Sequence, residues 1–218
     1  GQAIVDHPDV AGVSFTGSTA VGRKIGAALF QRGARMQLEM GGKNPLIVLD
    51  DADLDLAVEC AVQGAYFSTG QRCTASSRLI VTRGIHDAFI DAMTNRLSDL
   101  KVGDARALQT QMGPVVSAEQ LDIDKTYIEI GRSEGAELIH GGMRPENTPN
   151  GYYLAPTLFA NSSNEMRINR EEIFGPIASV QCVGSYGEGL QMAKDTDYGL
   201  SGGSITTDIK RQRQLRDH

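Results

Sequence analysis

One cysteine lies in a segment whose composition suits nucleophilic chemistry. Cys73 follows a Gly-Gln-Arg turn at residues 70–72 and precedes a stretch that predicts a strand. A cysteine in such a turn is accessible to a substrate, and the neighbouring Arg72 favours its thiolate form. The other two cysteines, Cys60 and Cys182, fall in a predicted helix and a predicted strand. There a cysteine is typically a small buried hydrophobe, so Cys73 is the candidate nucleophile.

The general base for this cysteine is predicted to be a glutamate. The four histidines are scattered along the chain at His7, His86, His140 and His218. They show neither metal-ligand spacing nor a pairing with the cysteine, which disfavours zinc and Cys–His catalysis. Glu39 lies between Leu38 and Met40 at the end of a predicted strand, before two glycines. Partial desolvation there would suit a general base. The alternative is a solvated glutamate before a turn.

Two further segments have the composition of ligand-binding loops. Residues 15–22 read Phe-Thr-Gly-Ser-Thr-Ala-Val-Gly between a strand and a helix. Gly17 permits a sharp turn, while Ser18 and the helix N-terminus offer donors to an anion such as a pyrophosphate. Residues 170–176 read Arg-Glu-Glu-Ile-Phe-Gly-Pro, which can place a carboxylate on a ribose and a ring beside a flat ligand. The alternatives are an ordinary capped turn and a charged loop before a strand.

Predicted strands and helices alternate along the chain. The strands cover residues 10–16, 36–40, 45–49, 77–82, 137–139, 153–159, 178–183 and 201–206. Helices are expected from Ser18 or Thr19 to Gly33, from 51–53 onward, over 85–97, 117–135 and 187–195, and from 208 onward. The helix after 51–53 presents an apolar face made of Leu54, Ala57, Val58, Ala61 and Ala65. This alternation is typical of an α/β fold with a mainly parallel sheet.

A domain boundary is expected near residues 40–42. Residues 1–40 form only strand–helix–strand, which is too little to bury both faces of a sheet, so they are expected to be the tail of a larger domain. The sequence also starts and stops abruptly, at a strand and in a helix, which suggests a fragment of a longer protein.

The composition excludes several classes of protein. The chain has 218 residues, 21 Lys plus Arg against 27 Asp plus Glu, and a net charge of −6, which argues against a nucleic-acid-binding protein. No apolar run approaches the roughly 18 residues of a membrane helix, and no signal peptide is visible. Three cysteines indicate reduced thiols in a cytoplasmic protein rather than a disulfide framework.

In order and spacing, the four motifs together resemble the aldehyde dehydrogenase superfamily. They read Phe-Thr-Gly-Ser, Leu-Glu-Met-Gly-Gly-Lys-Asn-Pro, Gly-Gln-Arg-Cys and Glu-Glu-Ile-Phe-Gly-Pro, and the resemblance spans essentially all of the chain. Around residues 70–82, 111–116 and 166–177 the chain is most similar to bacterial 2-oxoglutarate (α-ketoglutarate) semialdehyde dehydrogenases. The resemblance implies that residues 1–40 are the C-terminal tail of a Rossmann-like dinucleotide-binding domain. Residues 41–218 would then be a catalytic domain truncated at its C-terminus.

The resemblance also implies roles for single residues. Cys73 would be the nucleophile, and Glu39 the base that activates water. Ser18 would contact the cofactor pyrophosphate, while Glu172 would hold the nicotinamide ribose and Phe174 would pack near the nicotinamide. The remaining cofactor-binding positions are glycines: Gly17 and Gly22 would shape the helix start, and Gly41 would lie close to the cofactor.

Substrate contacts are expected from the residues that flank the nucleophile. Arg72 and Thr74 stand where side chains can line the substrate tunnel of this family. Arg72 can pair with a distal carboxylate of the substrate. The alternative is that Arg72 faces solvent or a neighbouring element.

The implied reaction oxidises an aldehyde to the acid with NAD or NADP through a cysteine thioester, without a metal. The expected substrate is 2-oxoglutarate semialdehyde, and succinate and glutarate semialdehydes are alternatives. The parent protein is expected to be a homodimer or homotetramer, and the 218-residue chain alone to be inactive. A non-catalytic folding or oligomerisation unit is a second possibility. A CoA-acylating relative is a third, but it needs no water-activating glutamate, so Glu39 favours hydrolysis.

Overall fold

The computed structural model describes residues 1–216, and the chain forms two compact units, Gly1–Gly41 and Gly42–His218. Each unit has its own hydrogen-bonded sheet. In the part of the chain that the structure describes, no helix is long and apolar enough to cross a membrane.

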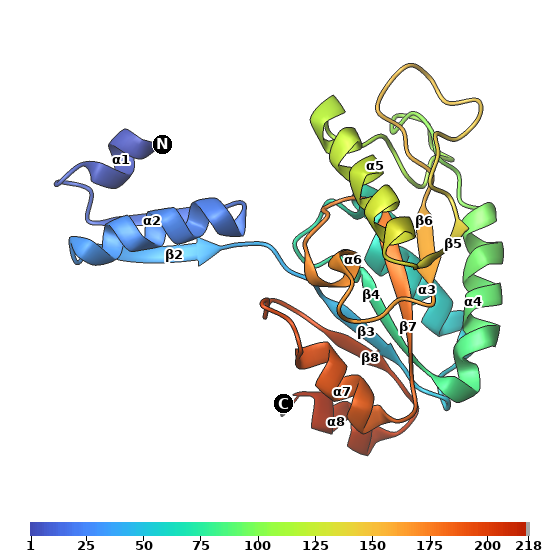
Figure 1. Cartoon of the computed structure of the whole chain (residues 1–218). Helices are drawn as coiled ribbons and strands as arrows, with labels where there is room; N and C mark the ends of the chain where they lie inside the picture. The colour runs from blue at the N-terminus through green and yellow to red at the C-terminus, as the bar shows by residue number, and fades with distance from the viewer. Residues whose placement is uncertain (217–218) are drawn as a thin grey trace. The chain divides into compact units, whose positions relative to one another are not determined.

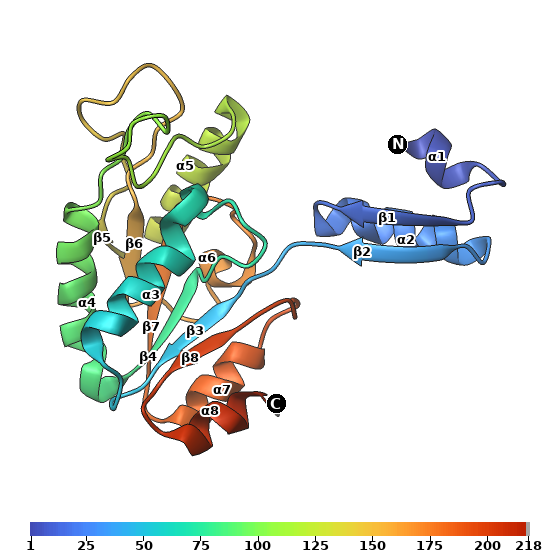
Figure 2. The ribbon, with the colours of Figure 1, turned by 180° about the vertical axis from the view of Figure 1, so that it is seen from behind.

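The first unit is a strand–helix–strand arrangement preceded by a short helix. Its elements are α1 (Gln2–Asp6), β1 (Gly12–Thr16), α2 (Thr19–Gln31) and β2 (Arg35–Glu39). The two strands pair in parallel, and α2 packs along them (Figure 2). Ser18 caps α2 as expected, because its Oγ accepts a hydrogen bond from the Val21 amide at 3.4 Å. The strand begins at residue 12 rather than 10, and α1 was not predicted.

The second unit is built on a mainly parallel sheet of six strands in the order β5-β6-β7-β4-β3-β8 (Figure 1). Only β5 runs antiparallel to its neighbour β6. The strands are β3 (Pro45–Val48), β4 (Arg78–Thr82), β5 (Glu137–His140), β6 (Thr157–Ala160), β7 (Ile177–Val183) and β8 (Gly203–Ile205). The helices are α3 (Leu54–Tyr66), η1 (Phe67–Gly70), α4 (Arg83–Ser98), α5 (Ala118–Ser133), α6 (Arg167–Arg170), α7 (Tyr186–Lys194) and α8 (Ile209–Arg216). The predicted α/β class is therefore confirmed.

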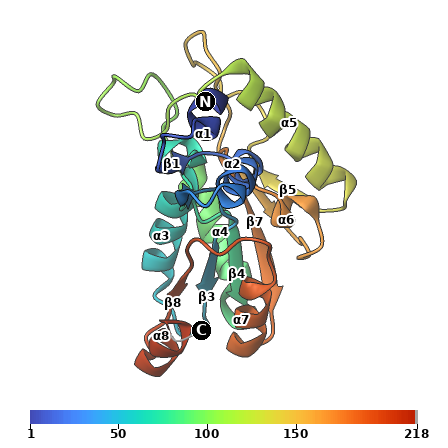
Figure 3. The ribbon, with the colours of Figure 1, turned by 90° about the vertical axis from the view of Figure 1, so that its left-hand side faces the viewer.

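Helices cover both faces of this sheet, and α3 and α5 lie on opposite sides of it (Figure 3). The largest apolar cluster joins α3 and α4 to one face and includes Val58, Phe89, Leu79 and Val180. Smaller clusters join α5 and α6, and separately α7, to the other face. The apolar face predicted for α3 lies in the largest cluster, where burial of such side chains contributes about 25 cal/mol per Å².

Several expected elements differ from those observed. The strand predicted over residues 153–159 covers only Thr157–Ala160, and the strand predicted over 201–206 covers Gly203–Ile205. The short helix α6 was not predicted, because four residues carry too little periodicity to show a helix. Cys60 is half-buried, whereas Cys182 is exposed and the prediction of a buried thiol there is wrong. Cys182 is the penultimate residue of β7, where its side of the strand is no longer covered. An apolar run in the sequence does not show how far the helices that cover a strand extend along it.

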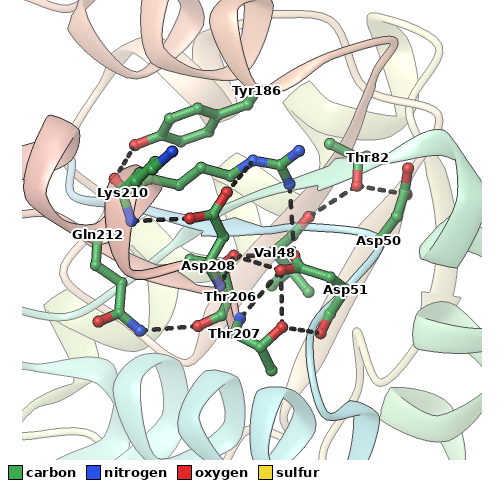
Figure 4. Close-up of polar contacts among 11 residues, drawn as sticks. Val48, Asp50, Asp51, Thr82, Tyr186, Thr206, Thr207, Asp208, Lys210 and Gln212 are labelled. Carbon is green, nitrogen blue, oxygen red and sulfur yellow. Dashed lines mark hydrogen bonds and ion pairs between the residues drawn. The ribbon is translucent and has the colours of Figure 1, made fainter.

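A polar cluster after β3 holds the C-terminal segment of the described chain (Figure 4). The Asp51 carboxylate accepts hydrogen bonds from Thr206 Oγ1 at 2.9 and 2.8 Å and from Thr207 Oγ1 at 2.9 Å. Arg211 Nη1 lies 3.6 Å from Asp51 Oδ1, and Tyr186 Oη donates to the Arg211 carbonyl at 2.7 Å. One carboxylate thus joins β3, the segment after β8 and helix α8.

A second polar feature of the fold is the fully buried Arg78 at the start of β4. Its guanidinium donates to Asn164 Oδ1 at 2.8 Å and to the carbonyl oxygens of Met192 at 2.5 Å and Ala193 at 3.3 Å. Both carbonyls belong to the last turn of α7, so Arg78 caps that helix. Burial lowers the pKa of Arg78 to about 10.

Replacing Arg78 with methionine is expected to destabilise the fold strongly. The methionine fills similar space but leaves the part-buried α7 carbonyls without this donor. The expected loss is about 2–4 kcal/mol in the free energy of unfolding, measured by urea denaturation of the chain followed by circular dichroism. The matched control is Arg83→Met at an exposed position just after β4, with an expected change within about 0.5 kcal/mol. Equal effects of the two substitutions would contradict the capping role.

Candidate functional site

The candidate residues of the second unit gather where its parallel strands begin. Residues 42–44 lead into β3, residues 71–77 into β4 and residues 171–176 into β7. These three strands are neighbours in the sheet, so the three segments meet at its amino-terminal edge. Ligands of open α/β sheets more often bind at the carboxyl ends of strands. The motifs, rather than that rule, therefore locate this site.

Asn44 connects the loop of the candidate nucleophile to the start of the sheet. Its Nδ2 donates to the carbonyl oxygens of Cys73 at 2.7 Å and Ala75 at 3.0 Å. Its Oδ1 accepts from the Ser201 amide at 3.1 Å, and the side chain is 2% exposed. These hydrogen bonds fix the main chain of the loop, while Cys73 itself is exposed.

Glu172, in the segment 171–176, contacts the segment that leads into β3. Its Oε1 accepts a hydrogen bond from the Gly42 amide at 3.1 Å. A Cβ at Gly42 would lie 2.8 Å from Asn44 Oδ1 and 3.0 Å from the Cys73 carbonyl oxygen. Only glycine therefore fits between these groups. Gly41, the glycine that the sequence predicts to lie close to the cofactor, directly precedes Gly42 in the chain.

The loop of the nucleophile rests on the segment that carries Glu172. Ser68, Thr69 and Gly70 have φ values of 55°, 59° and 65°, a left-handed turn that ends α3 and starts the loop. A Cβ at Gly70 would overlap the Gly175 carbonyl oxygen, so these two backbones touch. Phe174, just before Gly175, also has a positive φ of 61°, and the residue is 39% exposed. A non-glycine residue held in this region is typical of a functional loop.

The two candidate substrate residues flank Cys73 in different environments. Thr74 is exposed. Arg72 Nη2 donates to the carbonyl oxygens of Gln63 at 2.6 Å and Gly64 at 2.9 Å, both near the end of α3. In the structure Arg72 therefore ties the loop to a neighbouring element, which is the alternative left open by the sequence.

Lys43 is a residue of this site that sequence reasoning missed. It is 2% exposed and lines a cavity of about 20 Å³ together with Glu172 and Phe174. Burial lowers the pKa of Lys43 to about 7 and the charge of Arg78 acts in the same direction, while Glu172 and Glu171 oppose them. A lysine two residues before an apolar strand was the available signal, although only the fold shows that it is buried, as lysine rarely is without a specific role.

The remaining candidates lie in the first unit, at the carboxyl ends of β1 and β2. The Gly17 amide donates to the Glu39 carbonyl at 3.0 Å, which brings the first two motifs together. A Cβ at Gly22 would overlap the Met40 side chain, so glycine lets α2 pack there. Ser18 caps α2, and the half-buried Gly41 is the last residue of the unit.

Glu39 is exposed, and the expected partial desolvation is not observed. Successive strand residues point to opposite faces, and Leu38 faces α2, where a Cβ at Gly26 would lie 3.1 Å from Leu38 Cδ1. Glu39 therefore points away from α2, to the face of the two-stranded sheet that this unit leaves uncovered. Glu39 and Cys73 belong to different units.

The donor groups described in the two units suit parts of a dinucleotide. Among residues 1–216, no group of three His, Cys, Asp or Glu side chains could hold a metal ion. His218 lies outside the described residues. The capped start of α2 offers amide donors to an anion, and Glu172 offers a carboxylate to hydroxyl groups. The exposed ring of Phe174 offers an apolar face to a flat ligand.

Comparisons with known proteins identify relatives of this chain. The profile of the "Aldehyde dehydrogenase family" matches residues 1–218. The alpha-ketoglutaric semialdehyde dehydrogenase of Bacillus subtilis (strain 168) is 47% identical over 219 residues, which cover 100% of this chain and 45% of that protein. The betaine aldehyde dehydrogenase of Rhizobium etli (strain CIAT 652) is 44% identical over 218 residues, again covering 100% of this chain and 45% of that protein.

Solved structures give the same result. A crystal structure of betaine aldehyde dehydrogenase from Staphylococcus aureus in complex with NAD+ superposes with a TM-score of 0.95 at 37% identity. The match covers 98% of this chain and 43% of that chain, so the chain spans less than half the length of these relatives. The match along the whole sequence and the 47% identity show that this chain belongs to the aldehyde dehydrogenase family.

Proposed function

We propose that this chain is the nucleophile-bearing part of an aldehyde dehydrogenase that uses NAD or NADP. The observation that carries the proposal is the loop of Cys73, an exposed thiol whose main chain is fixed by the buried Asn44. Such a loop presents a nucleophile in a defined orientation, and Glu172 with Phe174 stand at the same corner. The relative solved with NAD+ supports a dinucleotide as the cofactor.

In the proposed mechanism the Cys73 thiolate forms a bond to the aldehyde carbon, and the carbonyl π electrons move to the oxygen. The resulting oxyanion is stabilised by hydrogen-bond donors, among them the Cys73 amide. When bound, the dinucleotide supplies the acceptor for the hydride that leaves this carbon. The product of that step is a thioester on Cys73. Glu39 then takes a proton from water, which attacks the thioester and releases the acid and the thiolate.

Each unit carries residues that are proposed to bind the cofactor. In the first unit Gly17, Ser18 and Gly22 shape the start of α2, whose amides suit a pyrophosphate. In the second unit Glu172 would hold the nicotinamide ribose, and the ring of Phe174 would pack near the nicotinamide.

We propose 2-oxoglutarate semialdehyde as the substrate, on the strength of the 47% identical relative of that name. Arg72 and Thr74 are proposed tunnel residues because they flank Cys73. Arg72 is proposed to shape this tunnel through the loop, since its guanidinium donates to two carbonyl oxygens of α3. The 44% identical betaine aldehyde dehydrogenases make a cationic aldehyde the natural competitor.

The test compares aldehydes of opposite charge in the complete enzyme. NADH or NADPH formation is measured with 2-oxoglutarate semialdehyde, succinate semialdehyde, betaine aldehyde and a neutral aldehyde of similar length. We expect kcat/KM for 2-oxoglutarate semialdehyde to exceed that for betaine aldehyde by at least about tenfold, since a site built for one charge rejects the other. If betaine aldehyde is the best substrate, the proposed substrate is wrong. If no aldehyde is turned over, the proposed aldehyde dehydrogenase activity is wrong.

A further inference from the structure

Helix α5 carries a buried carboxyl group that the proposed mechanism does not use. Asp124 is fully buried, and its Oδ1 accepts a hydrogen bond from Gln120 Nε2 at 2.9 Å. Its Oδ2 is buried without a hydrogen-bond partner in the described structure. Burial raises the pKa of Asp124 to about 7, although the hydrogen bond from Gln120 acts in the opposite direction. A buried carboxyl with an unpaired oxygen is costly, so its presence calls for an explanation.

The carboxyl of Asp124 packs against the segment that carries Phe174. A Cβ at Gly175 would lie 2.5 Å from Asp124 Cγ and 2.7 Å from Oδ2, so the carboxyl packs against the Gly175 backbone. The Nε2 of Gln120, which donates to Asp124, also donates to the Ile173 carbonyl at 3.0 Å. Ile173 and Gly175 are the two neighbours of Phe174. Asp124 and Gln120 therefore brace both sides of a residue that is held in the left-handed region.

The same contacts extend to Glu172 and to the nucleophile. Glu172 precedes Ile173 and accepts the hydrogen bond from Gly42. Gly175, which contacts Asp124, also packs its carbonyl against Gly70, three residues before Cys73. A displacement of Gly175 by a changed side chain at Asp124 would thus move the segment 172–175 first and the loop of Cys73 second.

We propose that Asp124 is a positioning residue for cofactor binding, which holds Glu172 and Phe174 in place through Gly175 and Gln120. The inference rests on the proposed function, because the roles of Glu172 and Phe174 belong to it. Burial favours the neutral form of this carboxyl over the charged form. Asparagine has the same shape as that neutral carboxyl, whereas leucine lacks the acceptor for Gln120 and brings a branched apolar group against Gly175.

The test uses the complete enzyme with Asp124→Asn, Asp124→Leu and the matched control Asp122→Asn on the same helix. The Asp122 side chain is 78% exposed and makes only a 4.0 Å contact with Lys125. We expect Asp124→Leu to raise KM and Kd for NAD+ about tenfold or more while KM for the aldehyde stays within about twofold. Asp124→Asn and Asp122→Asn are expected to stay within about twofold of the wild type for every constant.

A second variant and a cofactor-free measurement guard against simple misfolding. Gln120→Leu removes the donor to Ile173 and leaves the buried carboxyl in place, and it is expected to raise Kd for NAD+ in the same way. Without cofactor, amide hydrogen exchange of residues 172–177 should be faster in Asp124→Leu and Gln120→Leu but unchanged in Asp122→Asn. An unchanged Kd in Asp124→Leu, or equal losses for cofactor and aldehyde, would overturn the proposal. An inactive wild type would instead overturn the proposed function.

Discussion

Replacing Cys73 with serine in the complete enzyme is expected to reduce kcat/KM by at least about 10⁴-fold. The covalent path starts from a thiolate, and a cysteine is partly ionised at neutral pH whereas a serine hydroxyl without a neighbouring base is not. The thermal stability should change little, because the Cys73 side chain is exposed and the bond from Asn44 is made to its carbonyl. A variant that keeps more than a tenth of the wild-type activity would exclude Cys73 as the nucleophile.

The chain itself offers an independent check on the same residue. Cys73 and Cys182 are both exposed, so a difference in their alkylation rates reports activation of the thiol rather than access to it. We expect iodoacetamide, followed by peptide mass spectrometry, to modify Cys73 several times faster than Cys182, and Cys60 to be slowest because it is half-buried. Equal rates at Cys73 and Cys182 would favour the non-catalytic folding or oligomerisation unit.

Most of the fold could be predicted because its elements carry local signals. Helix α3 begins after Asp53, whose carboxylate accepts from the Leu56 amide at 3.0 Å, and its apolar face was readable from spacing alone. The strand predicted over residues 153–159 was too long at its start because an apolar run does not specify which residues find a pairing partner. The pairing of β6 with β7 starts only at Thr157.

The site could be predicted only where its chemistry is visible in the residue type. The cysteine after Gly-Gln-Arg and the acid pair before Ile-Phe-Gly-Pro can be recognised as candidate site residues from the sequence alone. Asn44, Lys43 and Asp124 cannot, because only the fold shows that these polar side chains are buried. Asn44, for example, reaches the Cys73 carbonyl 29 residues away. Glu39 shows the converse case, in which apolar neighbours in sequence did not mean burial.

Replacing Glu39 with glutamine in the complete enzyme is expected to reduce steady-state turnover by about 10²–10⁴-fold, the usual contribution of a general base. In the proposed mechanism Glu39 acts only after the thioester has formed. The variant should therefore still release a rapid burst of NADH, about one equivalent per active site, before turnover stalls. Stopped-flow measurement of NADH, with mass spectrometry of the acylated protein, checks both parts.

The burst separates the role of Glu39 from that of Cys73, because Cys73→Ser should lose the burst together with the turnover. Glu146→Gln serves as the control for the charge change, since Glu146 is exposed in the loop before β6, and it should leave both phases unchanged. If Glu39→Gln loses the burst as well, then Glu39 is needed before the thioester forms, and its assignment as the deacylation base is wrong. Full turnover in this variant would show that another group activates the water. Glu39 would then be a solvated surface residue, as its exposed position on β2 indicates.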